Sequence, residues 1–125
     1  MDLQKPTPQP LPQAFKGHLA TAVLHPDRVD FRRRWITRLG GNRSGTVLLA
    51  DVLKVLQVEP TRWVNGHVHL LTAADPGALR NLTMETGQQP AGNPRAILFS
   101  WGQRETQAAF VAAVGAALQG LRPGL

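Results

Sequence analysis

The chain has 125 residues, a length at which a single domain can bury a hydrophobic core of its own. Because it contains no cysteine, a disulfide framework, a cysteine-based zinc site and thiol catalysis are all excluded. The formal net charge is +6 at pH 7, and most of the excess lies in residues 28–43, which hold six arginines against Asp30 alone. The charge therefore points to one local feature rather than to a uniformly basic surface.

Residues 1–13 are expected to form a flexible arm. Proline at positions 6, 8, 10 and 12 removes amide donors and favours extended backbone, and the arm lacks the apolar stretch of a secretory signal. The longest apolar run, 108–118, is shorter than the roughly 20 residues that span a bilayer. We therefore expect a folded domain over 14–121, a short tail at 122–125, and a cytoplasmic location with peripheral membrane association as an option.

The first folded segments predict an antiparallel hairpin. Residues 17–25 are rich in β-forming residues, residues 28–35 alternate with period two, and Pro26-Asp27 between them suits a turn. The alternation assigns one face to Val29, Phe31, Arg33 and Trp35, and the other to Arg28, Asp30, Arg32 and Arg34. Residues 40–45, with the sequence GGNRSG, are predicted to be a loop.

The middle of the chain fits two interpretations. Residues 46–60 match helical spacing about as well as strand alternation, but four valines and the closing proline favour strands. Since Asp51 suits a bend, we predict two short strands, 46–50 and 52–59. Asn65-Gly66 lies between two alternating segments and predicts a hairpin turn, followed by a strand at 67–72.

The last third predicts one further strand and a helix. Residues 72–94 are rich in turn-forming residues, with one short strand expected near 80–85. Residues 95–101 alternate as a strand, and the alanine-rich residues 103–121 have the apolar spacing of an amphipathic helix.

Seven short, mostly antiparallel strands followed by one C-terminal helix predict an α+β, mainly β fold. This is the order of the pleckstrin-homology (PH) superfold, a bent antiparallel sheet or half-barrel whose open end is capped by the helix. Four segments carry a closer resemblance: VLHPDRVDFRR, GTVLLADVLKVLQVEP, NGHVHLL and NPRAILFSWGQRETQAAFVAAVGAAL. Together they resemble the bacterial PH-like domains of unknown function that are common in actinobacteria, over about residues 17–119. The resemblance implies a non-catalytic module.

The basic stretch is the first candidate site. In a PH-like fold the hairpins rim the open end of the barrel, where arginines can offer forked donors to the phosphates of acidic lipids or nucleic acid. The candidate residues are Arg32, Arg33, Arg34, Arg38 and Arg43. Because alternation sends Arg33 to the other face from its two neighbours, the triplet cannot form one three-pronged clamp. Arginine also outnumbers lysine eleven to three, so a GC-rich genome is an alternative explanation for the arginines.

Trp35 and Trp63 are the candidate partner-binding residues. Trp35 could stack on a base or lie at a membrane interface, and an exposed Trp63 or Trp101 would mark a partner surface. The leading functional interpretation is a binding or assembly module that docks a protein partner or a second copy along a sheet edge or at the barrel rim. The alternative is a module that binds acidic lipid headgroups or nucleic acid through residues 28–43. No small-molecule substrate is inferred.

Neither metal binding nor catalysis has a recognisable motif. His67 and His69 point to the same face of a predicted strand, and His18 or His25 could supply a third imidazole ligand. No acidic residue or cysteine lies at ligand spacing, so an ordinary exposed strand face is the preferred interpretation. There is no G-x-S-x-G motif and no closely spaced carboxylate pair, so we expect neither a cofactor nor an enzyme.

Overall fold

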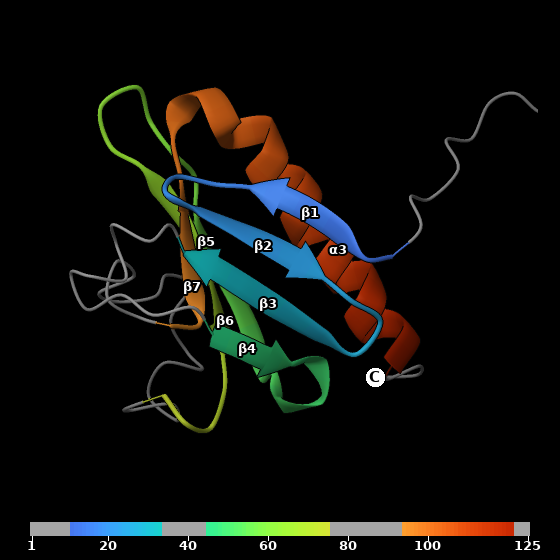
Figure 1. Cartoon of the computed structure of the whole chain (residues 1–125). Helices are drawn as coiled ribbons and strands as arrows, with labels where there is room; N and C mark the ends of the chain where they lie inside the picture. The colour runs from blue at the N-terminus through green and yellow to red at the C-terminus, as the bar shows by residue number, and fades with distance from the viewer. Residues whose placement is uncertain (1–10, 34–44, 76–93, 122–125) are drawn as a thin grey trace, which may run out of the picture.

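The computed structural model describes residues 11–33, 45–75 and 94–121. Two antiparallel sheets and one long helix make up this part of the chain (Figure 1). Sheet A has the strand order β1 (Gln13–Lys16), β2 (Ala20–Leu24), β3 (Arg28–Arg33) and β4 (Gly45–Leu48). Sheet B has the order β5 (Lys54–Val58), β6 (Gly66–Leu71) and β7 (Ala96–Phe99). A 3₁₀ turn, η3 (Trp101–Gln103), leads into helix α3 (Arg104–Leu121).

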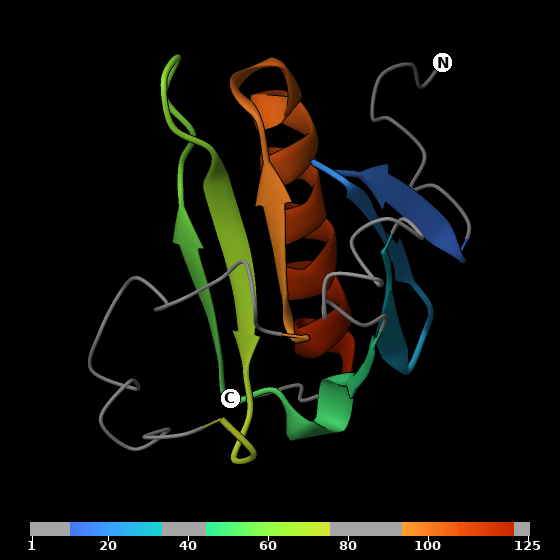
Figure 2. The same ribbon diagram turned by 60° about the vertical axis from the view of Figure 1, so that its left-hand side comes forward.

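The predicted fold class is confirmed. The structure is mainly β, with one C-terminal helix, and its described strands form two open sheets rather than a closed barrel. Figure 2 shows α3 running along the space between the two sheets, where it covers the inner side of both. The described residues include no helix with the length and apolar character of a membrane span.

The core is centred on Phe110 in α3. Its ring lies 5.3 Å from the ring of Phe15 and 6.4 Å from that of Phe31, both in sheet A, and 6.1 Å from that of Phe99 in sheet B. All four rings are buried. A single helical residue therefore contacts both sheets, as expected of a helix whose apolar stripe caps an open half-barrel.

The turn between β1 and β2 joins the two sheets. The amide of His18 donates to the Leu98 carbonyl at 2.7 Å, and a Cβ added at Gly17 would lie only 2.6 Å from that oxygen. Gln103 adds a second link, because its Nε2 donates to the Gly17 carbonyl at 3.1 Å while its Oε1 accepts from the Ser100 amide at 2.9 Å. The start of the helix is thereby fixed to the first hairpin.

Most predicted strands are confirmed. The hairpin at Pro26-Asp27 forms, with Leu24 paired to Val29 and the His25 amide donating to the Arg28 carbonyl at 2.8 Å. The predicted bend at Asp51 is the 3₁₀ turn η1 (Leu49–Asp51), which separates β4 from β5.

Two details of the prediction are wrong. Gln13 is the first residue of β1 and not part of an arm, because residues 13–16 pair with β2. Asn65-Gly66 does not form the turn between β5 and β6: Gly66 already belongs to β6, and the tip lies at residues 61–64. A Cβ at Gly66 would collide with the Val58 carbonyl oxygen, so this glycine allows close strand contact. The strand expected at 80–85, residues 1–10 of the arm and the tail at 122–125 lie outside the described residues.

Candidate functional site

The structure separates the two described arginines of the predicted anion site. Arg32 is exposed, whereas Arg33 turns inward, and its Nη2 donates to the Ala96 carbonyl at 2.6 Å. Burial lowers the pKa of Arg33. The predicted division of the triplet between two faces is therefore confirmed for these two residues, and Arg33 has a structural partner in β7. The remaining candidates, Arg34, Arg38, Arg43 and Trp35, lie outside the described residues.

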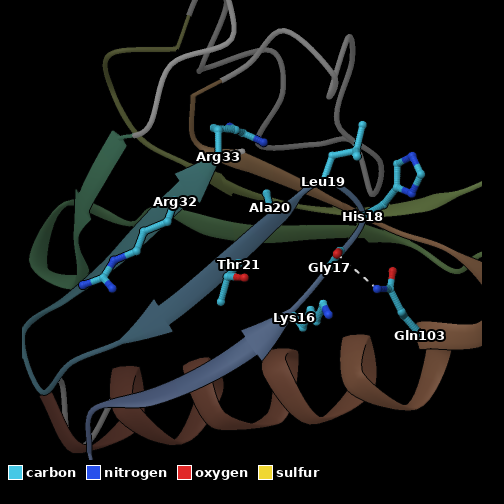
Figure 3. A pocket seen from close by; sticks show the side chains of 9 residues that line it. All are labelled: Lys16, Gly17, His18, Leu19, Ala20, Thr21, Arg32, Arg33 and Gln103. Carbon is cyan, nitrogen blue, oxygen red and sulfur yellow. Dashed lines mark hydrogen bonds between the residues drawn. The ribbon is translucent and has the colours of Figure 1, made fainter. Parts of the chain in front are cut away.

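A basic hollow lies beside the β1–β2 turn. Its volume is about 370 Å³, and none of the described residues that line it carries a carboxylate. Its cationic side chains come from Lys16, Arg32 and Arg33, and Figure 3 shows the two arginines leaving β3 in different directions. Lys16 and Arg32 flank Thr21 in one cross-strand row of sheet A. This Lys16–Thr21–Arg32 row can meet an anion on the outer face of the sheet.

The tip between β5 and β6 presents a tryptophan to solvent. Trp63 is 90% exposed and Val64 beside it is 67% exposed. The Thr61 hydroxyl accepts from the amides of both residues, at 3.2 and 3.0 Å, and the Thr61 amide donates to the Val64 carbonyl at 2.9 Å. The turn is thus held in shape by its own hydrogen bonds, and in this shape it leaves the Trp63 side chain exposed.

A groove lies between β5 and the first turns of α3. We call it the β5–α3 groove; its volume is about 310 Å³, and it is lined by Gln57, Glu59, Pro60, Trp101, Arg104, Gln107 and Ala108. Among the described strands, β5 has a neighbour, β6, on one side only. Gln107, only 2% exposed, links the two walls because its Nε2 donates to the Val58 carbonyl at 2.9 Å.

Two arginines surround the tryptophan in the wall of this groove. The guanidinium carbon of Arg104 lies 4.1 Å from the centre of the Trp101 ring, and that of Arg62 lies 6.0 Å from it. Arg104 also donates to the Trp101 carbonyl at 2.8 Å. Trp101 is 39% exposed, so the ring and both cations are accessible from solvent.

The prediction that His67 and His69 lie on an exposed strand face is wrong. They share a face of β6, but His67 is 8% and His69 is 2% exposed. His69 Nε2 lies 3.0 Å from Asp75 Oδ1, and Asp75 also accepts from the Thr72 amide at 2.8 Å and from Arg95 Nη2 at 2.9 Å. The buried imidazole therefore has a carboxylate partner, as burial of a polar group requires.

This buried network is a structural one. Asp75 joins residues on both sides of the segment 76–93, namely His69 and Thr72 before it and Arg95 after it. None of these residues lines either of the two hollows described above. Among the described residues, no group of three or more histidine or acidic side chains is placed to hold a metal ion.

Sequence reasoning singled out Trp63 but missed most of the groove. Trp101 was noted only as a residue whose exposure would mark a partner surface, and Glu59, Arg104 and Gln107 were not identified. One signal was present: Gln107 interrupts the apolar stripe of α3, and a polar residue at a buried helical position needs a hydrogen-bond partner. Comparison with protein-family models, with curated proteins and with solved structures finds no match for this chain.

Proposed function

We propose that this chain is a non-catalytic PH-like module that binds an extended segment of another protein in the β5–α3 groove. The observation that carries the proposal is the place of the groove. It lies between a helix and β5, which is an edge strand among the described strands. Trp101 lies in its wall, and Pro60 in the same wall leads into the tip that exposes Trp63. Strand addition at such an edge supplies main-chain hydrogen bonds, while the groove selects side chains.

The size of β5 sets the size of the ligand. The strand has five residues, which corresponds to a length of about 17 Å at 3.3–3.4 Å per residue. A bound segment of about five residues would match it, with alternate side chains directed toward α3. Such an interface is smaller than that of a stable heterodimer, so we expect weak and reversible binding.

The residues around the groove are of the types that dominate binding energy at interfaces. Tryptophan and arginine are enriched among such residues, and Trp63, Trp101, Arg62 and Arg104 lie together at this end of the molecule. Because Thr61 holds the tip in shape before binding, little conformational entropy is lost when a partner covers Trp63.

The proposal is tested by filling the groove. Ala108→Arg places a long side chain in its wall, while Ala116→Arg makes the same change at an exposed position two turns further along α3. Short random peptides displayed on phage are selected on the full chain and then tested against both variants. We expect Ala108→Arg to lose the selected peptides and Ala116→Arg to keep them.

Light scattering on the same proteins covers the case in which the bound segment belongs to a second copy. A dimer abolished by Ala108→Arg would identify the chain itself as the partner. The proposal would be contradicted if the protein is a monomer and Ala108→Arg still binds every selected peptide.

A second candidate function rests on the Lys16–Thr21–Arg32 row. Two cations flank a hydroxyl on the outer face of sheet A, beside a hollow without carboxylates, so this face suits a phosphate of an acidic lipid or of nucleic acid. Retention on DNA and on phosphatidylserine vesicles should fall with salt and fall further in Lys16→Gln and Arg32→Gln. Unchanged retention in both variants would eliminate this function.

A further inference from the structure

Arg62 and Arg104 are two cations without a carboxylate partner among the described residues. Every ion pair between two described residues involves Asp27, Asp30 or Asp75. Glu59 lies in the wall of the same groove and Glu105 follows Arg104, yet neither glutamate forms an ion pair with these arginines. Both cations are instead held beside the face of Trp101.

This arrangement prepares a site for an anion. Stacking on an aromatic ring limits the movement of a guanidinium but leaves its outward N–H donors available to a carboxylate. The two guanidinium carbons lie 4.1 Å and 6.0 Å from the centre of the same ring, so both cations border the space around Trp101. The anion site opens into the β5–α3 groove, because Trp101 and Arg104 line it.

We propose that the segment bound in the β5–α3 groove is acidic, with an aspartate or glutamate bound between Arg62 and Arg104. This inference rests on the proposed function and adds the chemistry of the partner. Charge complementarity favours it, because the site has two arginines beside one exposed ring. An apolar residue next to the acidic one would cover Trp63 and Val64, which are exposed at the adjoining tip.

A peptide fits this site better than a membrane surface does. A lipid surface can reach the projecting tip at Trp63, whereas the concave groove between β5 and α3 has the shape for a single extended chain. An extended chain can follow β5, enter the groove and present its carboxylate at the rim. Acidic membranes are therefore the competing occupant in the experiment.

The experiment uses the full chain and the peptides selected on it. We expect an aspartate or glutamate at a fixed position in most of them, and each of Arg62→Gln and Arg104→Gln should weaken binding by about fivefold, the scale of an exposed ion pair. Arg62→Lys and Arg104→Lys keep the charge but lose the planar stacked fork, and they should bind with intermediate affinity. Arg28→Gln is the control, because it also removes an arginine charge but Arg28 belongs to β3 and does not line the groove.

The outcomes separate this inference from the proposed function. One outcome would overturn the acidic partner and leave the groove function standing. In that outcome the selected peptides require Ala108, show no acidic preference, and bind Arg62→Gln and Arg104→Gln normally. Absence of any groove-dependent peptide would overturn both. Retention on phosphatidylserine vesicles that requires Arg62 and Arg104, without any groove-dependent peptide, would replace the acidic segment by a membrane. Circular dichroism of each variant excludes loss of fold as the cause.

Discussion

Replacing Phe110 by alanine tests how the fold is held together. The Phe110 ring is fully buried and contacts three other phenylalanine rings, two in sheet A and one in sheet B. Truncation of a buried phenylalanine costs about 3–5 kcal/mol through lost burial and the cavity that remains. Three aromatic neighbours keep Phe110 above the lower end of this range, at about 4 kcal/mol, because each aromatic pair adds about 0.5–1.5 kcal/mol to burial alone.

Urea denaturation followed by circular dichroism measures this loss. With a slope of about 2 kcal/mol per molar urea, the midpoint of Phe110→Ala should fall by about 2 M. Phe110→Leu keeps most of the volume but loses the three aromatic pairs, so it should lose less stability than Phe110→Ala. Trp63→Ala should stay within about 0.5 kcal/mol because Trp63 packs against little. A loss below about 2 kcal/mol in Phe110→Ala would show that α3 does not close the core as described.

Three further predictions concern single side chains. Asp75→Asn removes the carboxylate that pairs with His69 and Arg95, so it should lower the free energy of unfolding by about 3 kcal/mol in urea denaturation. A change below about 1 kcal/mol would contradict the network. Gly66→Ala should lower the melting temperature, because the added Cβ would lie 2.7 Å from Pro60 Cδ and collide with the Val58 carbonyl. Gly115 faces open space on α3, so Gly115→Ala should stabilise the fold by about 0.5–1 kcal/mol. Equal effects of the two changes would refute the close approach at Gly66. Partial desolvation alone would raise the pKa of Asp30, but its hydrogen bond with Thr46 and the charges of Arg28 and His25 lower it overall. Its carboxylate therefore stabilises the fold above the unfolded pKa of about 4, and this contribution disappears as the pH falls through the lower folded pKa. In a plot of unfolding free energy against pH, Asp30→Asn should therefore show a smaller loss of stability at acid pH than the unchanged chain. An unchanged plot would count against the interactions described.

The elements with a strong local period were predictable. Alternation in residues 28–33 placed Arg32 and Arg33 on opposite faces, and both the hairpin at Pro26-Asp27 and helix α3 followed from local signals. β1 was missed because only Phe15 among its four residues is a large apolar residue, too few to show a period. Its strand conformation comes from pairing with β2, which is a tertiary effect.

The errors at Asn65-Gly66 and at the two histidines have separate physical causes. Asn-Gly is a strong turn signal, but a glycine is also needed where two backbones come close, and the second requirement applies to Gly66. Alternation correctly put His67 and His69 on one face, but it cannot show whether that face is covered or which carboxylate meets His69. The β5–α3 groove was not predictable, because residues 57–60 and 101–108 meet only in the folded chain.

The position of Phe110 in the chain has a consequence for biosynthesis. Its ring completes a core whose other three rings belong to strands that leave the ribosome before it. Until α3 has emerged, a nascent chain presents the inner faces of two open sheets to solvent, together with unpaired strand edges. Stalling translation just before residue 104 should therefore give an aggregation-prone chain. Translation through the 18 residues of α3 and a C-terminal linker long enough to carry α3 out of the exit tunnel should restore solubility.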